Sequence, residues 1–412
     1  MPHGLLYGAS FTKGTLSFTD KQGRTICNAD LWNFLTLTAT SDNSSVKLKM
    51  YGTLSNEFEV NVGNGWEEYA FDTVIPLNAG QSCKWRCSAH PTTQTSSNYV
   101  KFVMTGTIEA SGNCNSMLSS DFDNITSLTG YDYAFVSLFS GCSSLTRAPK
   151  LPAKTLAGFC YSYMFYNCDN LTQAPVLPAT NLAKFCYQYM FYGCRSFMQA
   201  PSLPATTLAD SCYRYMFSNC SDLTQAPELP ATTLADSCYR FMFYWCYHLT
   251  QAPSLPATTL ANYCYNGMFY NCTALTQAPS LPATTLSNYC YNSMFYGCNH
   301  LMQAPELPST TLTDYCYSNM FHDCKSLMQA PALPATTLAT YCYSSMFSGC
   351  SKLKEARISA TTTAVNALYS WLNGVAATGN FYCDPNATIF PTGESGIPTG
   401  WTRLPLSDYP TT

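Results

Sequence analysis

The sequence predicts an α/β solenoid, with one short parallel strand and one helix in each repeat, preceded by an all-β sandwich-like domain. Two observations carry this prediction. A 26-residue phrase is written eight times between Leu151 and Ile358 without an insertion, and alternating apolar and polar segments precede it. The third copy reads LPATTLADSCYRYMFSNCSDLTQAPE, from Leu203 to Glu228. A fixed period of this length is typical of proteins that stack one repeat on the next.

Each repeat is expected to contain one amphipathic helix of about three turns. When its first leucine is counted as position 1, apolar residues fall at positions 6, 7, 10, 11, 14, 15 and 18. Steps of one, three and four place these residues on one half of a helix. A threonine at position 5 and an acid at position 8 resemble a capping box that would begin the helix. These pairs are Thr207/Asp210, Thr233/Asp236 and Thr311/Asp314.

The remainder of each repeat, such as Leu223 to Ala226, is too short and too rich in proline for a helix and predicts an extended segment. Such a segment can form hydrogen bonds only with its copies in neighbouring repeats, which gives a parallel ladder. The glutamine at position 23 would then stack on its copies along the solenoid.

A short strand and a helix in each repeat make up the leucine-rich-repeat plan. The phrase M-F-x-x-C-x-x-L-x-x-A-P-x-L-P-A resembles the BspA-like class of leucine-rich repeats over about Ile125 to Cys383. That class occurs in surface proteins of gut and oral bacteria and in proteins of their phages. The resemblance implies a curved solenoid used for binding, and it carries no catalytic residues to this chain.

The segments before the repeats divide the rest of the chain. Residues 1–27 are expected to be an attachment segment, and residues 28–111 to form the β-sandwich-like domain, because short alternating strands are separated there by turn residues. Residues 112–150 predict an N-terminal cap repeat. Residues 151–358 hold the eight repeats, and residues 359–412 predict a C-terminal cap and tail.

Cysteine is abundant, with 22 residues in the chain, and 16 of them occupy positions 10 and 18 of the repeats. Both positions lie on the face expected to be buried, at spacings that a disulfide does not easily bridge. We therefore expect columns of free thiols that fill the core as small apolar groups. A few disulfides or a metal site remain alternatives, although no C-x-x-C motif occurs. The state of the cysteines outside the columns stays open at Cys27, Cys83, Cys87, Cys114 and Cys383.

The composition argues against several classes of function. Charged residues make up 11% of the chain and the net charge is −4, so nothing attracts nucleic acid or an anionic membrane. No phosphate-binding loop or metal-ligand spacing occurs, and His248, His300 and His322 lack a recurring carboxylate or nucleophile partner. We expect no enzymatic activity, no cofactor and no metal. The chain also shows neither a secretory signal nor an apolar stretch of about 20 residues, so membrane insertion is not expected.

The candidate binding site comes from comparing the eight copies with one another. Core positions hardly change, whereas positions 8, 9, 12, 13, 16, 17, 19 and 20 vary and are rich in Tyr, Phe, Ser, Asn and Gly. Antibody loops use a similar mixture of rigid aromatics and small polar groups. The predicted ligand-binding residues form an aromatic helix-side face and are Tyr163, Tyr166, Tyr189, Tyr192, Tyr215, Phe241, Tyr244, Trp245, Tyr247, His248, Tyr263, Tyr270, Tyr289 and Tyr296.

Two alternatives compete with this site. Taken singly, each tyrosine is better explained by a role in packing adjacent repeats together. Taken as a set, the tyrosines vary from copy to copy, and this variation favours a role in binding. The strand side, with its glutamine column, is a second candidate surface and is more uniform along the chain.

These observations predict a non-enzymatic adhesion or receptor-binding protein. The expected setting is a phage fibre or virion appendage that contacts a bacterial surface protein or glycan. The N-terminal region would contact other virion proteins, and a homo-oligomer is expected, a trimer by analogy with phage fibres. The alternatives are a structural decoration or assembly component of the virion, and a bacterial surface adhesin that lacks its signal peptide.

Overall fold

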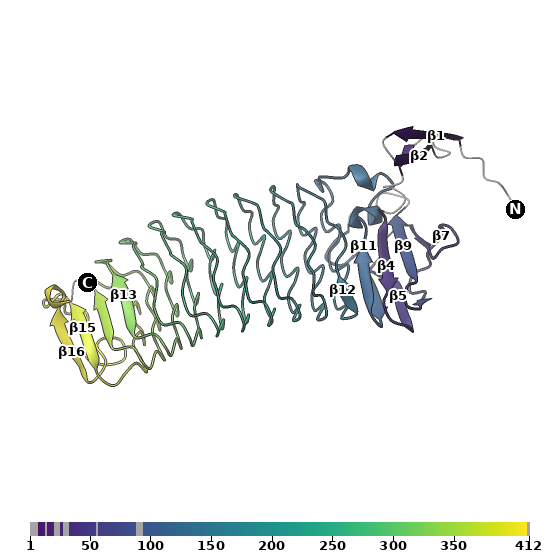
Figure 1. Ribbon diagram of the computed structural model, residues 1–412. Coiled ribbons are helices and arrows are strands. Elements are labelled where there is room, and N and C mark those ends of the chain that lie inside the picture. The colour runs from purple at the N-terminus through teal and green to yellow at the C-terminus, as the bar shows by residue number, and fades with distance from the viewer. Residues whose placement is uncertain are drawn as a thin grey trace.

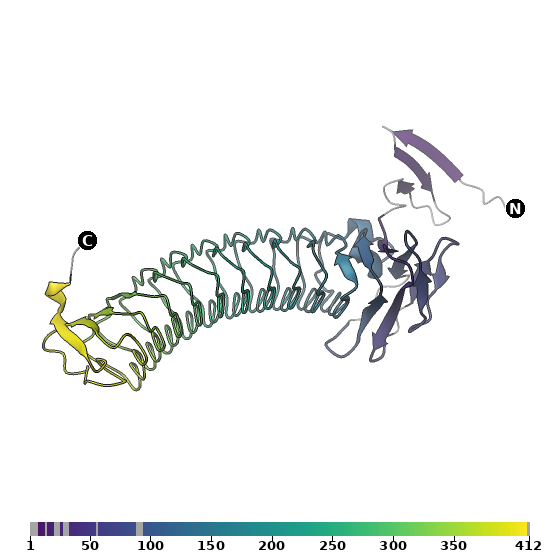
Figure 2. The same cartoon turned by 60° about the horizontal axis from the view of Figure 1, so that its bottom comes forward.

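The chain forms a long, gently curved stack of coils with a small β-domain at its N-terminal end (Figures 1 and 2). The computed structural model describes residues 7–12, 15–19, 25–27, 33–54, 57–87 and 94–409. Within these ranges it contains strands, turns and short 3-10 helices but no α-helix. The predicted α/β solenoid with a helix in every repeat is therefore wrong, and the molecule is a β-solenoid built from turns and parallel pairings.

The N-terminal region consists of sheets whose strands pair antiparallel, except where β12 joins the largest sheet in parallel. A separate three-stranded sheet contains β1 (Tyr7–Thr12), β2 (Thr15–Thr19) and β3 (Thr25–Cys27). The next sheet contains, in spatial order, β10 (Tyr99–Thr105), β5 (Ser44–Tyr51) and β8 (Ile75–Leu77). The largest sheet contains β12 (Leu145–Arg147), β11 (Ile108–Ser111), β4 (Leu35–Ala39), β9 (Ser82–Cys87), β6 (Phe58–Asn61) and β7 (Glu67–Glu68).

The two larger sheets enclose one core because side chains alternate between buried and part-exposed along their strands, as in β9 and β10. Trp85 of β9 and Phe102 of β10 are both fully buried, and their ring centroids lie 5.1 Å apart. The rest of the expected attachment segment, and the start of the domain at residues 28–32, lie outside the described residues.

The β-domain joins the solenoid without a linker. Strand β11 pairs antiparallel with β4 on one side and parallel with β12, in the cap repeat, on the other. Phe102 stacks on Phe139 of the cap repeat with ring centroids 5.3 Å apart. Two 3-10 helices, η2 (Cys114–Met117) and η3 (Phe122–Asn124), lie in the intervening segment. The sheet therefore covers the open end of the stack, as an end cap must.

A row of tight turns takes the place of the predicted helix in each repeat. The N–H of Met164 donates to the carbonyl of Tyr161, three residues back, at 3.2 Å. The N–H of Tyr163 instead donates to the carbonyl of Gln188 in the next repeat at 2.9 Å. This alternation continues through positions 9 to 18, so each repeat binds its neighbour through the backbone, whereas an α-helix would satisfy its N–H groups internally.

The backbone of this row returns to the left-handed region every four residues. Positions 9, 13 and 17 have positive φ in each of the eight repeats, as at Phe159 (56°), Tyr163 (56°) and Asn167 (53°) in the first. A regular helix excludes this conformation. The predicted capping boxes are also wrong, because no helix begins there, and two of the three acids bind the next repeat: Asp236 Oδ1 accepts from the N–H of Asn262 at 3.0 Å, and Asp314 Oδ1 accepts from the N–H of Thr340 at 3.1 Å.

The opposite side of each repeat pairs in parallel and in register, as predicted. Gln225 forms parallel bridges with both Gln199 and Gln251. At the C-terminal end these bridges lengthen into a parallel sheet of four strands, which closes the stack. They are β13 (Gln329–Leu333), β14 (Glu355–Ile358), β15 (Gly379–Cys383) and β16 (Trp401–Pro405), followed by the 3-10 helix η4 (Leu406–Asp408).

The core of the solenoid is a set of columns, each built from one position of every repeat. Positions 10, 11, 14, 15 and 18 contribute Cys, Tyr, Met, Phe and Cys, all at most 1% exposed in the eight repeats. The position-15 rings stack along the axis with centroids 5.5–5.8 Å apart from Phe139 to Phe347. The burial predicted from sequence is correct for these five positions, whereas position 7 is only partly buried in seven of the eight repeats. The helix that the pattern predicts is wrong.

The cysteines act as small core side chains. All 21 cysteines whose side chains the structure describes are buried, and all of them except Cys87 are described as free thiols; the side chain of Cys27 is not among those described. At position 18 the thiol also donates to the carbonyl of position 15 in the preceding repeat, as from Cys220 Sγ to Phe191 O at 3.1 Å. Burial also raises the pKa of the cysteine thiols at position 10, to about 12 at Cys186 and Cys238. The raised pKa keeps these thiols protonated and unreactive near neutral pH.

Candidate functional site

The outward side chains of the turn row form the most varied surface of the solenoid, which we call the turn-row face. It consists of positions 9, 12, 13, 16, 17, 19 and 20 of the eight repeats. Because the turns repeat every four residues, positions 10, 11, 14 and 15 point into the core, and the exposed side chains lie at the intervening positions, although position 12 is itself buried in five of the eight repeats. Every residue predicted to bind ligand lies on this face and is at least partly exposed.

Position 13 carries a stack of four aromatic rings over the first four repeats. The centroids of Tyr163, Tyr189, Tyr215 and Phe241 follow one another at 4.7, 4.7 and 4.9 Å. The stack ends at Gly267, where a Cβ atom would lie only 2.1 Å from Cε1 of Phe241. The predicted residues at this position are therefore brought together into one continuous column.

Two further positions carry stacks in the later repeats. At position 16, Tyr244, Tyr270, Tyr296 and His322 follow one another at 4.9, 4.3 and 4.5 Å. Position 16 also holds the pair Tyr166 and Tyr192 in the first two repeats, at 4.8 Å. At position 9 the stack contains Tyr263, Tyr289, Tyr315 and Tyr341, with neighbouring rings 4.5, 4.4 and 4.7 Å apart.

The sequence prediction omitted several members of these columns. Tyr315, Tyr341 and His322 extend predicted stacks by one or two repeats, and Tyr133 and Phe159 begin another at position 9, with rings 4.6 Å apart. All of them occupy positions that the alignment of the copies had already marked as variable. Following each position to both ends of the repeat array would have found them.

Stacking covers the ring faces and leaves hydroxyl groups at the surface. Partial burial raises the pKa of Tyr189 and Tyr270 to about 12, with neighbouring tyrosines adding to the effect. These phenols are therefore neutral at physiological pH and can both donate and accept hydrogen bonds. The surface can offer a partner rows of hydroxyl and amide groups held rigidly by their stacked neighbours.

The fourth repeat carries the densest aromatic cluster. Trp245 packs against Tyr244 and Tyr247, with ring centroids 5.0 and 6.4 Å away. Tyr247 is 41% exposed. Next to it, the Nδ1 atom of His248 lies 2.8 Å from the carbonyl oxygen of Ser221.

Trp245 also occupies a strained position. Its φ of 61° lies in the left-handed region, where the other seven repeats place Asn, Gly or Asp at the same position. A bulky side chain with positive φ is unusual and costs of the order of 1–2 kcal/mol. Strain of this kind tends to gather at functional sites.

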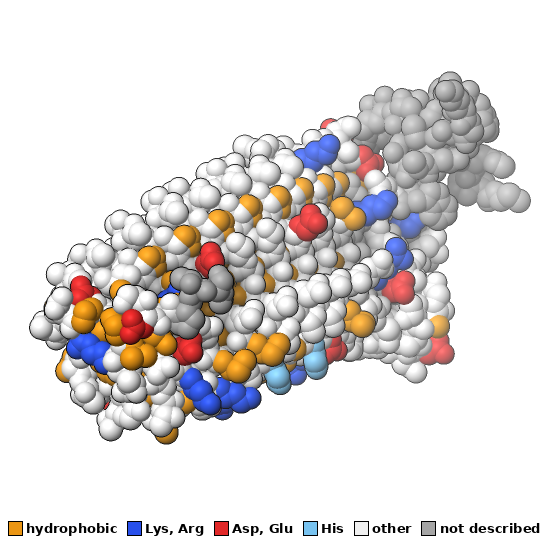
Figure 3. Space-filling view, turned by 60° about the vertical axis from the view of Figure 1, so that its left-hand side comes forward, with side chains coloured by type: hydrophobic (Ala, Val, Ile, Leu, Met, Phe, Trp, Pro, Cys, Tyr) orange, Lys and Arg blue, Asp and Glu red, His pale blue; other side chains and the backbone are white. Residues whose placement is uncertain are grey.

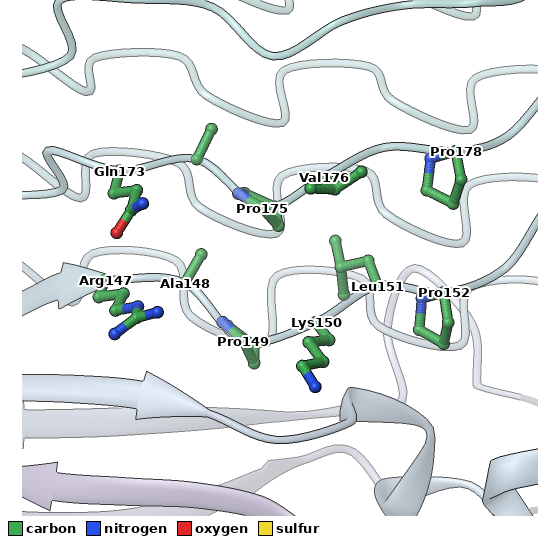
Figure 4. Close-up of a pocket in the computed structure, with 11 residues that line it drawn as sticks. Arg147, Ala148, Pro149, Lys150, Leu151, Pro152, Gln173, Pro175, Val176 and Pro178 are labelled. Atoms are coloured by element: carbon green, nitrogen blue, oxygen red, sulfur yellow. The ribbon is translucent and has the colours of Figure 1, made fainter. Parts of the chain in front are cut away.

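The strand side is the second candidate surface and is more uniform. Figure 4 shows Arg147 and Pro149 lying directly below Gln173 and Pro175 of the next repeat around a shallow hollow. A similar hollow near the C-terminal end is lined by Gln303, Glu306 and Tyr409, among others. Figure 3 shows how such columns run lengthwise over one face, with hydrophobic and polar rows side by side and few charges between them.

Within the described residues, no three His, Cys, Asp or Glu side chains gather in a way that could hold a metal ion. No helix in the same part of the chain has the length and hydropathy needed to cross a membrane.

Comparison with known proteins identifies the repeats. The sequence model of the BspA type leucine-rich repeat region matches the chain in six copies, over residues 98–198, 159–301 and 237–370. Together these spans reach from residue 98 to residue 370, which is more than half of the chain. No curated protein matches the chain, and no solved structure does.

Proposed function

The chain belongs to the BspA type leucine-rich-repeat family, and from that premise we propose that it is a non-enzymatic binding protein. Its turn-row face would contact a protein or glycan on a bacterial cell surface. Repeat proteins of this class commonly present an extended surface to a partner, because the core of each repeat is satisfied by its neighbours alone.

The contrast between constant and varied columns carries this proposal. Positions 10, 11, 14 and 18 hold Cys, Tyr, Met and Cys in all eight repeats, so packing fixes them. Position 13 reads Tyr, Tyr, Tyr, Phe, Gly, Ser, Asn and Ser, on a backbone that hardly changes. The backbone conformation does not require different residues at this position, whereas recognition of a partner with an irregular surface would require them.

Packing between repeats accounts for part of the aromatic content. Each stacked ring gains about 0.5–1.5 kcal/mol from its neighbour, which helps to offset the positive φ at positions 9 and 13. Trp245 is different, because its position is filled in every other repeat by a residue suited to positive φ. A strained tryptophan beside the exposed Tyr247 favours a contact site in the fourth repeat.

We place the protein on a phage particle, as a fibre or appendage whose β-domain faces the other virion proteins. Two alternatives remain for the same surface. In a structural decoration component, the turn-row face would pack against sister subunits. In a bacterial adhesin, the same face would contact a host or a neighbouring cell.

The test is binding of the purified chain to intact bacterial cells, beside a variant in which Tyr244, Trp245 and Tyr247 are changed to Ser. We expect the wild type to bind and the folded variant to lose binding by about tenfold or more, as hot-spot aromatics do. Equal binding by both would indicate that the binding site lies on the strand side or on the β-domain. Binding by neither would contradict the proposal and favour the structural component.

A further inference from the structure

Two arginines interrupt the aromatic columns in the middle of the turn-row face. Position 9 carries aromatic rings in repeats one and two and in repeats five to eight, but it is Ser211 and Ser237 in repeats three and four. In these two repeats position 12 is Arg214 and Arg240, whereas the other repeats have Ser, Gln or Asn there. The chain thus places two guanidinium groups, one repeat apart, where the row of rings is broken.

Aromatic rings frame both guanidinium groups. The Cζ atom of Arg214 lies 5.4 Å from the ring centroid of Tyr215. The Cζ atom of Arg240 lies 5.3 Å from that of Phe241 and 5.0 Å from that of Tyr263. Such contacts hold a planar cation in place but leave its N–H donors, which lie in the plane, to find acceptors elsewhere.

Those donors are poorly satisfied by the protein. Arg240 Nε donates to Asn266 Oδ1 at 3.1 Å, but the buried Nε of Arg214 has no hydrogen-bond partner among the described residues. No carboxylate of the described chain lies within 4 Å of either group. Asp210 and Asp236 precede the arginines by four residues, and the carboxylate of Asp236 accepts hydrogen bonds from the backbone and side-chain N–H groups of Asn262.

The two positive charges also oppose each other. Burial lowers the pKa of Arg240, and the neighbouring Arg214 lowers it further. Packing alone would be served better by the neutral side chains used at position 12 in the other repeats. Paired arginines without a carboxylate are suited to an external oxyanion, because a guanidinium binds a carboxylate through two parallel hydrogen bonds.

We propose that Arg214 and Arg240 form a subsite for a carboxylate group of an acidic glycan. This inference rests on the proposed function and names the ligand class for the same face. The surroundings favour a glycan over an acidic protein. Around the two arginines, stacking on the neighbouring repeats covers much of the apolar ring faces and favours contacts through hydroxyl and amide groups. A stable protein interface requires a desolvated apolar centre instead.

The test measures binding of the full chain to oligomers of galacturonic acid and of sialic acid by calorimetry. A neutral galactose oligomer and a glutamate oligomer serve as comparison ligands. The site variant is Arg214→Met with Arg240→Met, which keeps side-chain length and apolar packing. The control is Arg195→Met, which removes an exposed cation that lies 4.0 Å from Asp169. Thermal melts of each variant show whether it is folded.

We expect at least one acidic sugar oligomer to bind the wild type and the neutral oligomer not to bind. The affinity of the double variant for the acidic oligomer should fall by about tenfold or more, because hydrogen bonds to charged groups are lost. Arg195→Met should bind as the wild type does. Failure of both acidic sugars to bind, or equal binding by the folded double variant, would overturn the inference. Tighter binding of the glutamate oligomer would replace the glycan with an acidic protein.

The same preparations separate this inference from the proposed function. If the wild type binds cells and the variant changed at Tyr244, Trp245 and Tyr247 does not, but no acidic sugar binds, then only the carboxylate subsite is wrong. If the wild type binds neither cells nor acidic sugars, both proposals fail.

Discussion

Met216 shows how completely each core side chain is enclosed, since it is 0% exposed between the copies of itself in the neighbouring repeats. Its conversion to Ala should lower the free energy of unfolding by about 2–5 kcal/mol, because the contacts are lost and a cavity remains. Urea unfolding followed by far-ultraviolet circular dichroism measures the change. Met198→Ala is the matched control, because Met198 is 61% exposed, and it should change stability by about 0.5 kcal/mol or less. Equal effects of the two substitutions would contradict the arrangement of the core columns.

The buried thiols predict how stability depends on pH. Burial raises the pKa of Cys186 and Cys238 from an ordinary value of 9.0 to about 12. Between these values the folded chain keeps protons that the unfolded chain has lost, so stability falls as pH rises. The contribution is fully present below about pH 9. We expect thermal melts to be nearly constant from about pH 7 to 8.5 and to fall steeply above about pH 9. A melting temperature that stayed constant up to about pH 11 would contradict the burial of these columns.

The candidate residues could be found from sequence because the eight copies serve as their own comparison. Tyr189, Tyr244 and Tyr270 were identified as outward by their position in the repeat, and the structure places them there. Arg214 and Arg240 were not identified, because an arginine among variable residues looks like an ordinary solvated charge. Their importance depends on which rings surround them and on the lack of an acid nearby, and only coordinates give either.

At the scale of the element, the apolar pattern was read with the wrong period. The buried pairs at positions 10–11 and 14–15 and the cysteine at position 18 recur every four residues, whereas a helix has 3.6 residues per turn. Over three turns the two periods are hard to tell apart. The decisive signal was at position 17, where Asn167, Gly193 and Asp323 are residues that accept positive φ. Asn, Gly or Asp at this one position in seven of the eight repeats would be out of place in a helix interior.

Pairs of position-17 residues in successive repeats are fitted to each other. A Cβ atom on Gly193 would lie 2.1 Å from Oδ1 of Asn167, and Gly297 and Gly349 stand in the same relation to Asn271 and Asp323. The asparagine or aspartate of one repeat therefore covers the glycine of the next. This alternation is a packing rule between elements and not a property of either residue alone.

Gly193→Ala should therefore destabilise the protein for two reasons, the positive φ of 73° and the clash with Asn167. Gly130→Ala is the control, because Gly130 has a φ of 86° but nothing within 4 Å of the added Cβ. Chemical denaturation should show a larger loss for Gly193→Ala than the roughly 1–2 kcal/mol of the φ term alone. Adding Asn167→Gly should recover the excess. If the second substitution recovered nothing, the pairing would be wrong.

At the scale of the whole molecule, the repeats form one continuous body with the β-domain. Strand β11 pairs with β12 of the cap repeat, and β13 to β16 close the far end (Figure 1). The parallel pairing of the repeats follows from sequence, because identical segments 26 residues apart have only each other as partners. The junction does not follow, because β11 and β12 share no sequence pattern; their pairing comes with tertiary contacts such as the hydrogen bond from the N–H of Ile108 to the carbonyl of Ser144 and the packing of Phe102 on Phe139.

This continuity makes the stack a rigid support on which only the outward columns differ. Positions 13, 16 and 17 can be exchanged between repeats without touching the core, because the backbone has the same conformation in each, provided that the new residue fits the residue at the same position in the neighbouring repeats. The central claim, that these columns carry the binding activity, can therefore be tested with residues that the chain itself already uses.

The most direct measurement is cell binding by a variant in which the fourth repeat receives the residues of the eighth. Phe241→Ser, Tyr244→Ser and Trp245→Gly introduce the side chains found at Ser345, Ser348 and Gly349. We expect the melting temperature to stay within a few degrees of the wild type, since every introduced residue is native to its position, and binding to fall about tenfold or more. A folded variant that binds cells as the wild type does would contradict the claim.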